Sequence, residues 1–491
     1  MAWLALMFVR FVGYSDIISN AFTVLSIAMA LYIISKADVP AYRMGWILLI
    51  VTFPLFGGLL YLLLGDKRPA KYMRLRLEKG MRNHDVLTPQ DPVVVEALRA
   101  ESPRTAGLSA YISNYAKFPV WQNTAVRYHA LGEAQYEDLL PALRQAEKFI
   151  FLEYFIIEEG ELWTSVLDIL TEKAAAGVDV RVIYDDVGCL GKLPANYPKK
   201  LEKYGIKCLV FNPFVPVISL VMNNRDHRKI LVIDGHTVFT GGINLADEYI
   251  NHRVRFGHWK DSGLMLTGAA AWNFTVMFLE IWNAYRHDDE DFAAFRPDAE
   301  AMNTESDGFV QPFSDSPLDG ETVSVNVYLD ILAQAQDYVY IFTPYLAISD
   351  ELHLALCAAA KRGVDVRMVL PGTPDKRVAF RLSRSYYLPL MEAGVRIYEY
   401  TPGFLHAKSY VSDDRLAVVG TINMDYRSLY LHFECGVLMI GSTAIADLKK
   451  DALKTFCVSH EVTVAERRRN WLSRLTGGLI DSILRVFAPL F

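Results

Sequence analysis

Two long apolar stretches dominate the start of the chain. Ile17–Ser35 contains no charged residue, and neither does Met44–Gly65. Each stretch is about long enough to cross a hydrocarbon core of roughly 30 Å as a helix. The short connector Lys36–Arg43 would join them, so the pattern predicts a transmembrane helical hairpin over residues 1–65, with spans at about 17–35 and 44–65. The alternatives are a pair of buried core helices or, because of Pro54 and Gly57-Gly58, a kinked or re-entrant second helix.

Basic residues follow the second stretch and orient the hairpin. Residues 66–82 carry seven cations, whereas the connector carries only Lys36 and Arg43. The positive-inside rule then places the C-terminal bulk in the cytoplasm. We interpret residues 66–125 as a basic juxtamembrane linker that lies against anionic headgroups, which attract each cation by about 1 kcal/mol near the surface. A solvated linker helix is a compatible interpretation. The cations are Lys67, Arg68, Lys71, Arg74, Arg76, Lys79 and Arg82.

The rest of the chain is an internal repeat of strand and helix patterns. Lys148–Ile157 resembles Tyr338–Ala347, and both are continuous in apolar residues, as buried strands are. A helical pattern follows each one, and then the pentapeptide GVDVR opens a second strand at Gly177 and again at Gly363. Strands that alternate with helices indicate parallel α/β packing. We therefore predict two tandem α/β domains, at 126–305 and 306–460, each with a mixed sheet flanked by helices and related by a pseudo-two-fold axis.

Composition narrows the class of protein. Of 491 residues, 52% are apolar, which is ample for large cores, and the net charge of −6 argues against a general nucleic-acid binder. The five cysteines are widely scattered without a C-x-x-C pair, so we expect small buried side chains and neither disulfides nor a zinc site.

One motif occurs in both halves of the repeat. H-x-K-x₄-D appears as His227, Lys229 and Asp234 and again as His406, Lys408 and Asp413. On an extended strand, positions i and i+2 share a face, so each His and Lys converge on one point. A histidine can attack phosphorus or protonate a leaving oxygen, and lysines neutralise phosphate oxygens. The pseudo-two-fold axis would unite both copies in one centre for phosphodiester chemistry that requires no metal and no cofactor. The motif aspartates are either catalytic or, in our preferred interpretation, hold the corner where strand meets turn.

Two further pairs of residues occupy matched positions. Asn244 and Asn423 end the turns G-G-I-N and G-T-I-N, where backbone N–H groups and an amide are able to hold phosphate. Asp261 and Glu434 open equivalent apolar strands, and we predict that they contact the far nitrogens of the histidines.

Many segments of the chain resemble the phospholipase D superfamily and, within it, the bacterial cardiolipin synthases. The resemblance covers nearly the whole sequence, including YLLLGDK, FLEYFI, NNRDHRKILVIDG, TGGINLADEYI, IFTPYL, SRSYY, YEYTPGFLHAKSYVSDD and GTINMDYRSLYLHFE. It implies that the enzyme joins two phosphatidylglycerols into cardiolipin and releases glycerol through a phosphatidyl-histidine. It also implies His227 as the nucleophile and His406 as the general acid and then base. Where the family has a G-S turn this chain has Gly242 and Thr421, so a hydroxyl for phosphate binding remains only at Thr421.

The resemblance also sets location and alternatives. It implies a multi-pass protein of the bacterial inner membrane, with its catalytic domains on the cytoplasmic side, that acts on anionic phospholipids and not on nucleic acid. The other possible activities are a phospholipase D-type hydrolase, a phosphatidyltransferase with a different donor or acceptor, a nuclease and, from another class, a silent membrane scaffold. The oligomeric state stays open.

Two apolar segments have two interpretations each. Phe214–Asn224, inserted before the first motif, is either a lipid-contacting loop or core. Residues 461–491 form an amphipathic C-terminal tail that lies in the membrane interface or docks onto the catalytic domains.

Overall fold

A computed structural model describes most of the chain. The described residues are 20–36, 39–65, 71–80, 87–214, 224–286, 291–302, 304–305, 308–318, 320–468 and 471–490. They divide into two compact units. Residues 69–215 and 224–470 make the large unit, which holds both halves of the repeat; residues 1–68, 216–223 and 471–491 make the small one.

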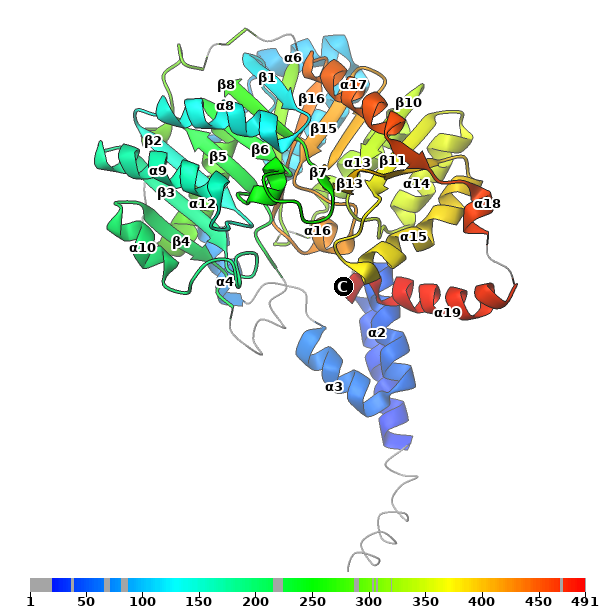
Figure 1. Cartoon of the computed structure of the whole chain (residues 1–491). Helices are drawn as coiled ribbons and strands as arrows, with labels where there is room; N and C mark the ends of the chain where they lie inside the picture. Colours follow the sequence, from blue (N-terminus) through cyan, green and yellow to red (C-terminus); the bar gives the residue numbers. More distant parts are fainter. Residues whose placement is uncertain are drawn as a thin grey trace, which may run out of the picture. The chain divides into compact units, whose positions relative to one another are not determined.

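The first half is a seven-stranded mixed sheet. Its strand order is β1-β8-β6-β5-β2-β3-β4, and only β2, β3 and β4 run parallel to one another. Leu152 on β2 faces a core built with helices α8 and α9, whereas its neighbour Phe151 stacks on Phe278 of α12. Because adjacent strand residues point to opposite faces, helices cover both sides of the sheet (Figure 1). The elements are β1 (Thr124–His129), α8 (Gly132–Arg144), β2 (Phe149–Tyr154), α9 (Glu161–Ala175), β3 (Asp179–Asp185), α10 (Tyr197–Lys203), β4 (Lys207–Phe211), β5 (Lys229–Ile233), β6 (Thr237–Gly241), β8 (Gly263–Gly268) and α12 (Ala271–Arg286).

The second half repeats this plan in eight strands. Its order is β17-β12-β11-β10-β14-β15-β16-β9, with β10, β11 and β12 parallel. The repeated pentapeptide GVDVR opens β3 and β11, as the sequence predicted. The elements are β9 (Phe309–Asp315), α13 (Val323–Gln334), β10 (Tyr338–Phe342), α14 (Asp350–Lys361), β11 (Asp365–Pro371), α15 (Arg377–Glu392), β12 (Arg396–Tyr400), β14 (Ser409–Ser412), β15 (Leu416–Gly420), α16 (Tyr426–Tyr430), β16 (Glu434–Ile440), α17 (Ala444–Cys457) and β17 (Ser459–Glu461). The prediction of duplicated α/β domains with mixed sheets is confirmed.

Short parallel pairings join the halves at two equivalent places. β13 (Gly403–Leu405) pairs with β7 (His258–Lys260), and Asp226 forms a single parallel bridge with Phe433. Each pairing brings the segment just before one H-x-K motif beside the segment just before the other half's predicted carboxylate. The two motifs are thereby positioned by backbone hydrogen bonds between the halves.

The segment that the sequence indicated as a linker packs onto the large unit where it is described. Helix α4 (Lys71–Gly80) contacts α12 through a face that buries Leu77. Further along, α6 (Pro92–Glu101) and α7 (Pro103–Tyr111) lead into the first sheet. The Arg104 guanidinium donates to the carbonyl of Ala333, 2.7 Å away. These residues are part of the folded unit rather than a free spacer.

The small unit contains the N-terminal apolar stretches. A helix covers residues 20–35, and the second stretch forms two helices, α2 (Pro40–Thr52) and α3 (Pro54–Leu64), instead of one. The break falls before Pro54, which lacks the N–H that a continuous helix requires. Gly57 allows the two helices to turn tightly, because a Cβ there would lie 2.6 Å from the carbonyl oxygen of Leu49. Among the residues that the structure describes, no single helix combines the length and apolar character needed to cross a membrane.

Large apolar side chains cover the outside of the small unit. A core of Ile33, Trp46, Ile50 and Tyr61 holds its helices together. Helix α19 (Trp471–Phe487) contacts α2 and exposes an apolar face. The exposed residues are Val24, Leu25, Ile27, Leu31, Tyr32, Ile34, Met44, Leu48, Val51, Phe53, Phe56, Leu59, Leu62, Leu479, Ile480 and Ile483. Most of the segment 214–224 lies outside the described residues.

Candidate active site

The two H-x-K motifs lie at the junction between the halves. His227 lies two residues before the start of β5 and donates its backbone N–H to the carbonyl of Phe433 at 2.9 Å. His406 lies between β13 and β14, and its N–H donates to the carbonyl of Lys260 at 2.7 Å. Both imidazoles are buried, and Lys229 and Lys408 are more so. The sequence predicted both histidines on strands. In the structure each histidine lies just outside a strand, and its motif lysine lies on or next to the strand that follows.

Each histidine contacts a carboxylate that comes from the opposite half. Nδ1 of His227 lies 2.9 and 3.0 Å from the two carboxylate oxygens of Glu434. Nδ1 of His406 lies 2.6 Å from Oδ2 of Asp261. A proton on Nδ1 leaves the lone pair on Nε2, where attack or proton transfer takes place. Matched strand positions were the signal for these carboxylates, but sequence gave no indication that the pairs would cross.

Burial and the clustered cations determine the electrostatics of the centre. Burial, reinforced by Lys229, His432, Lys408 and His406, holds the pKa of His227 well below its ordinary value. Burial and the charge of Lys408 lower the pKa of His406 to about 4. Because His406 acts on His227, and Lys229 acts on His406, the two motifs form one electrostatic unit.

The lysines are poised to lose their protons near neutral pH. Burial lowers the pKa of Lys229 to about 8 and that of Lys408 to about 7, although the nearby carboxylates partly oppose this. Each ammonium donates to the backbone carbonyl of the histidine two positions earlier. A bound phosphate would favour the charged lysines, so the site suits an anion.

The two carboxylates differ in protonation tendency. Burial raises the pKa of Glu434 well above the usual range, although Lys229 and hydroxyls from Ser428 and Thr421 oppose it. Burial also tends to raise the pKa of Asp261, but the nearby His406 and Lys408 have a larger opposite effect. The pKa of the Asp261 carboxyl is therefore lowered. Asp261 is therefore the ionised partner.

The turns differ between the halves in the residue that lies beside the carboxylate. The hydroxyl of Thr421, which the sequence predicted to bind phosphate, is fully buried and donates to Glu434, so it supports that carboxylate. Gly242 holds the equivalent place, where a Cβ would lie only 2.0 Å from Oδ1 of Asp261. The shorter carboxylate thus requires glycine beside it, whereas the longer one has room for threonine.

The two predicted phosphate-binding asparagines also differ. The amide of Asn244 is fully used: its oxygen accepts from the N–H of Ile156 at 3.0 Å, and its nitrogen donates to the hydroxyl of Tyr249 at 2.7 Å. The side-chain oxygen of Asn423 is buried and has no hydrogen-bond partner among the described residues. Only Asn423 retains hydrogen-bonding capacity for a ligand.

The motif aspartates lie at the far ends of their strands. Asp234 accepts from the backbone N–H groups of Glu147, Lys148 and Phe149, at 2.7–2.8 Å. Asp413 accepts in the same way from residues 336–338. Both have positive φ, 50° and 52°. These contacts favour the corner-holding interpretation, and we give the two aspartates no direct part in the chemistry.

Several aromatic rings at the centre were not predicted from sequence. Phe155 packs edge-on against His227, with ring centroids 4.9 Å apart, and His432 lies 5.7 Å from His227. Tyr249 and Trp259 each lie 5.5 Å from His406. The repeat held a signal for two of them, because Trp259 and His432 each stand two residues before the paired carboxylates.

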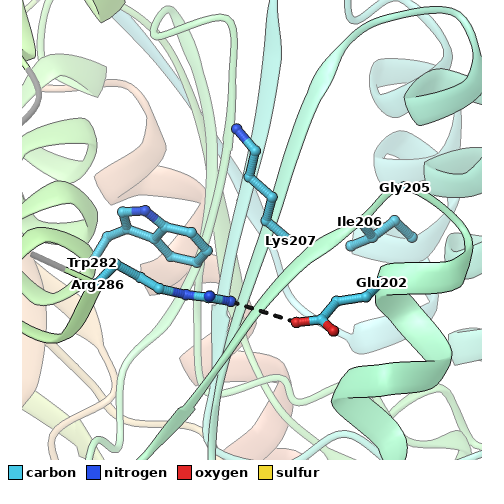
Figure 2. Close-up of a pocket in the computed structure, with 6 residues that line it drawn as sticks. All are labelled: Glu202, Gly205, Ile206, Lys207, Trp282 and Arg286. Atoms are coloured by element: carbon cyan, nitrogen blue, oxygen red, sulfur yellow. Dashed lines mark ion pairs between the residues drawn. The ribbon is translucent and has the colours of Figure 1, made fainter. Parts of the chain in front are cut away.

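The structure also has a surface pocket away from the motifs. It is lined by residues of α10, β4 and α12 and has a volume of about 220 Å³ (Figure 2). Arg286 lies 3.8 Å from Glu202 in an ion pair and 5.4 Å from the ring of Trp282. None of its lining residues belongs to either H-x-K motif, so we assign it no part in the chemistry.

The duplicated fold and the paired His–Lys centre define an enzyme of the phospholipase D type. A family model described as "Cardiolipin synthase, PLD-like domain" matches residues 139–255 and 328–455, and one described as "Phospholipase_D-nuclease N-terminal" matches residues 24–65. The chain belongs to the cardiolipin synthase family.

Individual relatives extend over almost the entire sequence. An uncharacterised protein of Streptococcus mutans is 44% identical over 94% of this chain and all of its own length. The cardiolipin synthase of Alkalihalophilus pseudofirmus is 32% identical over 96% of this chain and 93% of its own, and that of Geobacillus kaustophilus is 33% identical over 94% and 92%. The crystal structure of phosphatidylserine synthase from Haemophilus influenzae has a TM-score of 0.59 at 16% identity, covers 78% of this chain and 98% of its own, and thus shares the fold.

Proposed function

We propose that the chain is a cardiolipin synthase: it transfers a phosphatidyl group from one phosphatidylglycerol to another and releases glycerol. The observation that carries this proposal is the crossed pair of His–carboxylate contacts around two buried lysines. Full-length relatives with this activity in their names support the choice of substrate class.

In the first step, Nε2 of His227 attacks the phosphorus of the donor lipid. The bond from phosphorus to the glycerol oxygen breaks, and that oxygen takes a proton from Nε2 of His406, which the anionic phosphodiester and Asp261 hold as an imidazolium once the donor is bound. Glycerol therefore leaves as a neutral alcohol. Lys229, Lys408 and the side-chain N–H of Asn423 donate to the non-bridging oxygens, where negative charge concentrates in the transition state.

In the second step, the proton returns. Nε2 of His406 takes the proton of a glycerol hydroxyl on the acceptor lipid while that oxygen attacks the phosphorus. The bond from phosphorus to His227 breaks, which frees the nucleophile and releases cardiolipin. Both reactions pass through the same covalent intermediate, so a water molecule in place of the acceptor would give phosphatidic acid.

The difference between the carboxylates supports this division of roles. A residue that carries a proton must be stabilised as an imidazolium, and the ionised Asp261 beside His406 provides that charge. Glu434 is hydrogen-bonded by two hydroxyls and by Nδ1 of His227, so it orients the nucleophile. We assign Asp261 and Glu434 as positioning residues on this basis.

We also propose that residues 1–65 anchor the enzyme in the bacterial inner membrane, with the catalytic domains (126–305 and 306–460) on the cytoplasmic side. The support is the exposed apolar surface of the small unit and the cations that follow it. Such a surface is expected to contact lipid, where the substrates reside. Alkaline extraction of cell membranes tests this anchoring: the full chain should stay in the pellet, whereas a chain that lacks residues 1–65 should enter the supernatant.

Product analysis tests the activity. Purified protein is incubated with phosphatidylglycerol vesicles, and lipids and released glycerol are quantified together. We expect cardiolipin and glycerol in equal amounts, and neither with His227→Ala. Phosphatidic acid without cardiolipin would refute the transferase assignment and indicate a hydrolase.

A further inference from the structure

His432 is a further histidine beside the nucleophile, with 11% of its side chain exposed and its backbone held by hydrogen bonds. It lies between α16 and β16, and its N–H donates to the carbonyl of Arg427 at 2.9 Å. The next residue, Phe433, accepts from the N–H of His227 and donates to the carbonyl of Arg225. These bonds fix the backbone of His432 beside the nucleophile, and its ring centroid lies 5.7 Å from that of His227.

Both ring nitrogens of His432 are buried without a hydrogen-bond partner among the described residues. The nearest carboxylate oxygen is Oε1 of Glu434, 3.9 Å from Nδ1, and it already accepts from His227 and Ser428. Buried polar atoms in native proteins almost always have partners, and exceptions call for a ligand or a functional reason. An imidazole with two open nitrogens has room for one hydrogen-bond donor and one acceptor from a ligand.

The charges around His432 favour an anionic ligand. Burial and the cations Arg427, Lys229, Arg225 and Lys376 together hold the pKa of His432 well below its ordinary value. The ring is therefore neutral, with one N–H and one lone pair. The flank lies beside His227, because the two ring centroids are 5.7 Å apart and the N–H of His227 donates to the carbonyl of Phe433, the neighbour of His432.

A metal ion is the competing occupant of this flank. Nitrogens of His227 and His432 and an oxygen of Glu434 lie within 4.8 Å of one another, which fits the spacing of metal ligands. However, a divalent cation there would face the same four cationic side chains, and it would compete with the protons that His227 and the hydroxyls share with Glu434. The electrostatic argument thus favours an anion with a hydroxyl group nearby.

We propose that His432, Arg427 and Lys376 form a second phosphodiester subsite, which binds the phosphate of the acceptor lipid. The proposal rests on the transferase function above, because only a transferase of this kind must hold two phosphates at once. The first phosphate binds between the two H-x-K motifs. The second is one glycerol away, so its subsite must adjoin the centre, as His432 does. The N–H of His432 donates to a phosphoryl oxygen of the acceptor, and its other nitrogen accepts from the glycerol hydroxyl that takes no part in transfer.

The test compares two acceptors that differ in charge. Phosphatidylglycerol offers a glycerol hydroxyl with a phosphate, and monoacylglycerol offers one without. Both compete in one vesicle preparation for the phosphatidyl group of a labelled donor, and the ratio of the two transfer products is measured. We expect wild type to prefer the charged acceptor and His432→Leu and Lys376→Gln each to lower that preference by about tenfold, as loss of a charge-assisted contact does.

The controls separate binding from structural damage. Arg377 is the exposed neighbour of Lys376, so Arg377→Gln removes a nearby charge outside the subsite and should keep the wild-type ratio. His432→Asn retains a donor and an acceptor and should restore part of the preference. Equal loss of both products in His432→Leu, or equal ratios in Lys376→Gln and Arg377→Gln, would overturn the proposal.

Two further outcomes are also decisive. If zinc added after chelation inhibits wild type but not His432→Leu, the flank is a metal site and the anion subsite is refuted. If wild type produces only phosphatidic acid, the transferase function itself fails; if wild type makes cardiolipin but the variants keep its ratio, only the subsite fails.

Discussion

The imidazoles of His227 and His406 have opposite neighbours at Nδ1. His406 faces the ionised Asp261, whereas His227 faces Glu434, a carboxyl whose pKa burial raises. Glycine at position 242 and threonine at position 421 accommodate the two different carboxylate lengths. The two motifs are alike in sequence, but their histidines therefore face carboxyl groups with different tendencies to ionise.

Asp261 also supports the charge of Lys408, and this leads to a prediction about pH. Lys408 must be protonated to stabilise the phosphoryl oxygens, so kcat/KM should fall more steeply as pH rises through the lysine pKa values of about 7 and 8. This fall adds to the decline that begins near pH 4, where free His406 loses its proton because its pKa is about 4. The negative charge of Asp261 raises the pKa of Lys408. In Asp261→Asn that support is lost, so the alkaline limb should move to lower pH by about 1 unit.

The pH profile of kcat/KM for wild type and the variant measures this shift. Asp186→Asn, which removes a carboxylate outside the centre, is the control and should keep the wild-type limb. An alkaline limb that stays in place or moves to higher pH in Asp261→Asn would show that Lys408 does not need its proton.

Individual residues show how far sequence patterns reach. The repeat alignment was enough to locate His227, His406 and the carboxylates that contact them. It did not predict the contact of Thr421 with Glu434, because that contact depends on the path of β16 from the same half. It did not single out His432, because the matched position in the other half, Trp259, is a residue of a different kind.

Among the elements, the turn after β5 explains the spacing between His and Asp that the two motifs share. The carboxylate of Asp234 binds three successive N–H groups at the start of β2 and fixes the end of β5 against it. The separation of His and Asp in the motif is therefore the length of one short strand.

Because the motif aspartates hold the strand corners, we expect their replacement to lower the stability of the protein and to leave the catalytic step itself intact. Asp234→Ala leaves three N–H groups without their acceptor and should lower the free energy of unfolding by about 2–3 kcal/mol. Asp413→Ala should cost less, because the equivalent bonds to Gln336 and Asp337 are exposed to solvent. Thermal unfolding and activity well below the transition measure both effects. Loss of activity in a variant with unchanged stability would contradict the structural role.

Helix α19 leads to a second prediction at this scale. Leu479, Ile480 and Ile483 are exposed on one face of the helix. A group of large apolar side chains exposed to water is unfavourable and commonly marks a surface that contacts lipid or protein. If this face lies in the lipid interface, Leu479→Asp with Ile483→Asp should weaken binding of a chain without residues 1–65 to anionic vesicles by more than tenfold.

Vesicle sedimentation measures that binding. Ser482→Asp adds an exposed charge beside the apolar face and is the control, which should bind within about threefold of the parent. Equal binding of the parent and the double variant would favour the alternative, in which α19 serves only as a contact for protein.

The elements also show why some predictions from sequence succeed and others do not. Continuous apolar strands and the repeated pentapeptide were enough to place both sheets. The second apolar stretch was predicted as one helix but forms two, α2 and α3. The break lies at Pro54, which lacks a backbone N–H, and an average of hydropathy over the stretch does not detect this. The segment expected as a linker packs on α12 through Leu77, a tertiary contact that composition does not encode.

In the whole molecule, neither half contains a complete centre. Each motif histidine comes from one half and its carboxylate from the other, and the pairing of β7 with β13 and of Asp226 with Phe433 sets their register. Duplication followed by divergence at positions 242, 261, 421 and 434 therefore gives one site with two unlike histidines. A pseudo-two-fold arrangement follows from the repeat, but the crossing of contacts appears only in three dimensions.

The central claim is that His227 receives the phosphatidyl group and His406 carries the proton, and a donor with a leaving group that needs no proton tests it most directly. Phosphatidyl-4-nitrophenol is mixed rapidly with His406→Ala and with His227→Ala. Nitrophenolate release and the label on the protein that survives base but is lost in acid, as expected of a phosphorus–nitrogen bond, are followed. The account predicts a stoichiometric burst in His406→Ala with the phosphatidyl group on His227, and no burst in His227→Ala. A burst in His227→Ala with the label on His406 would contradict it.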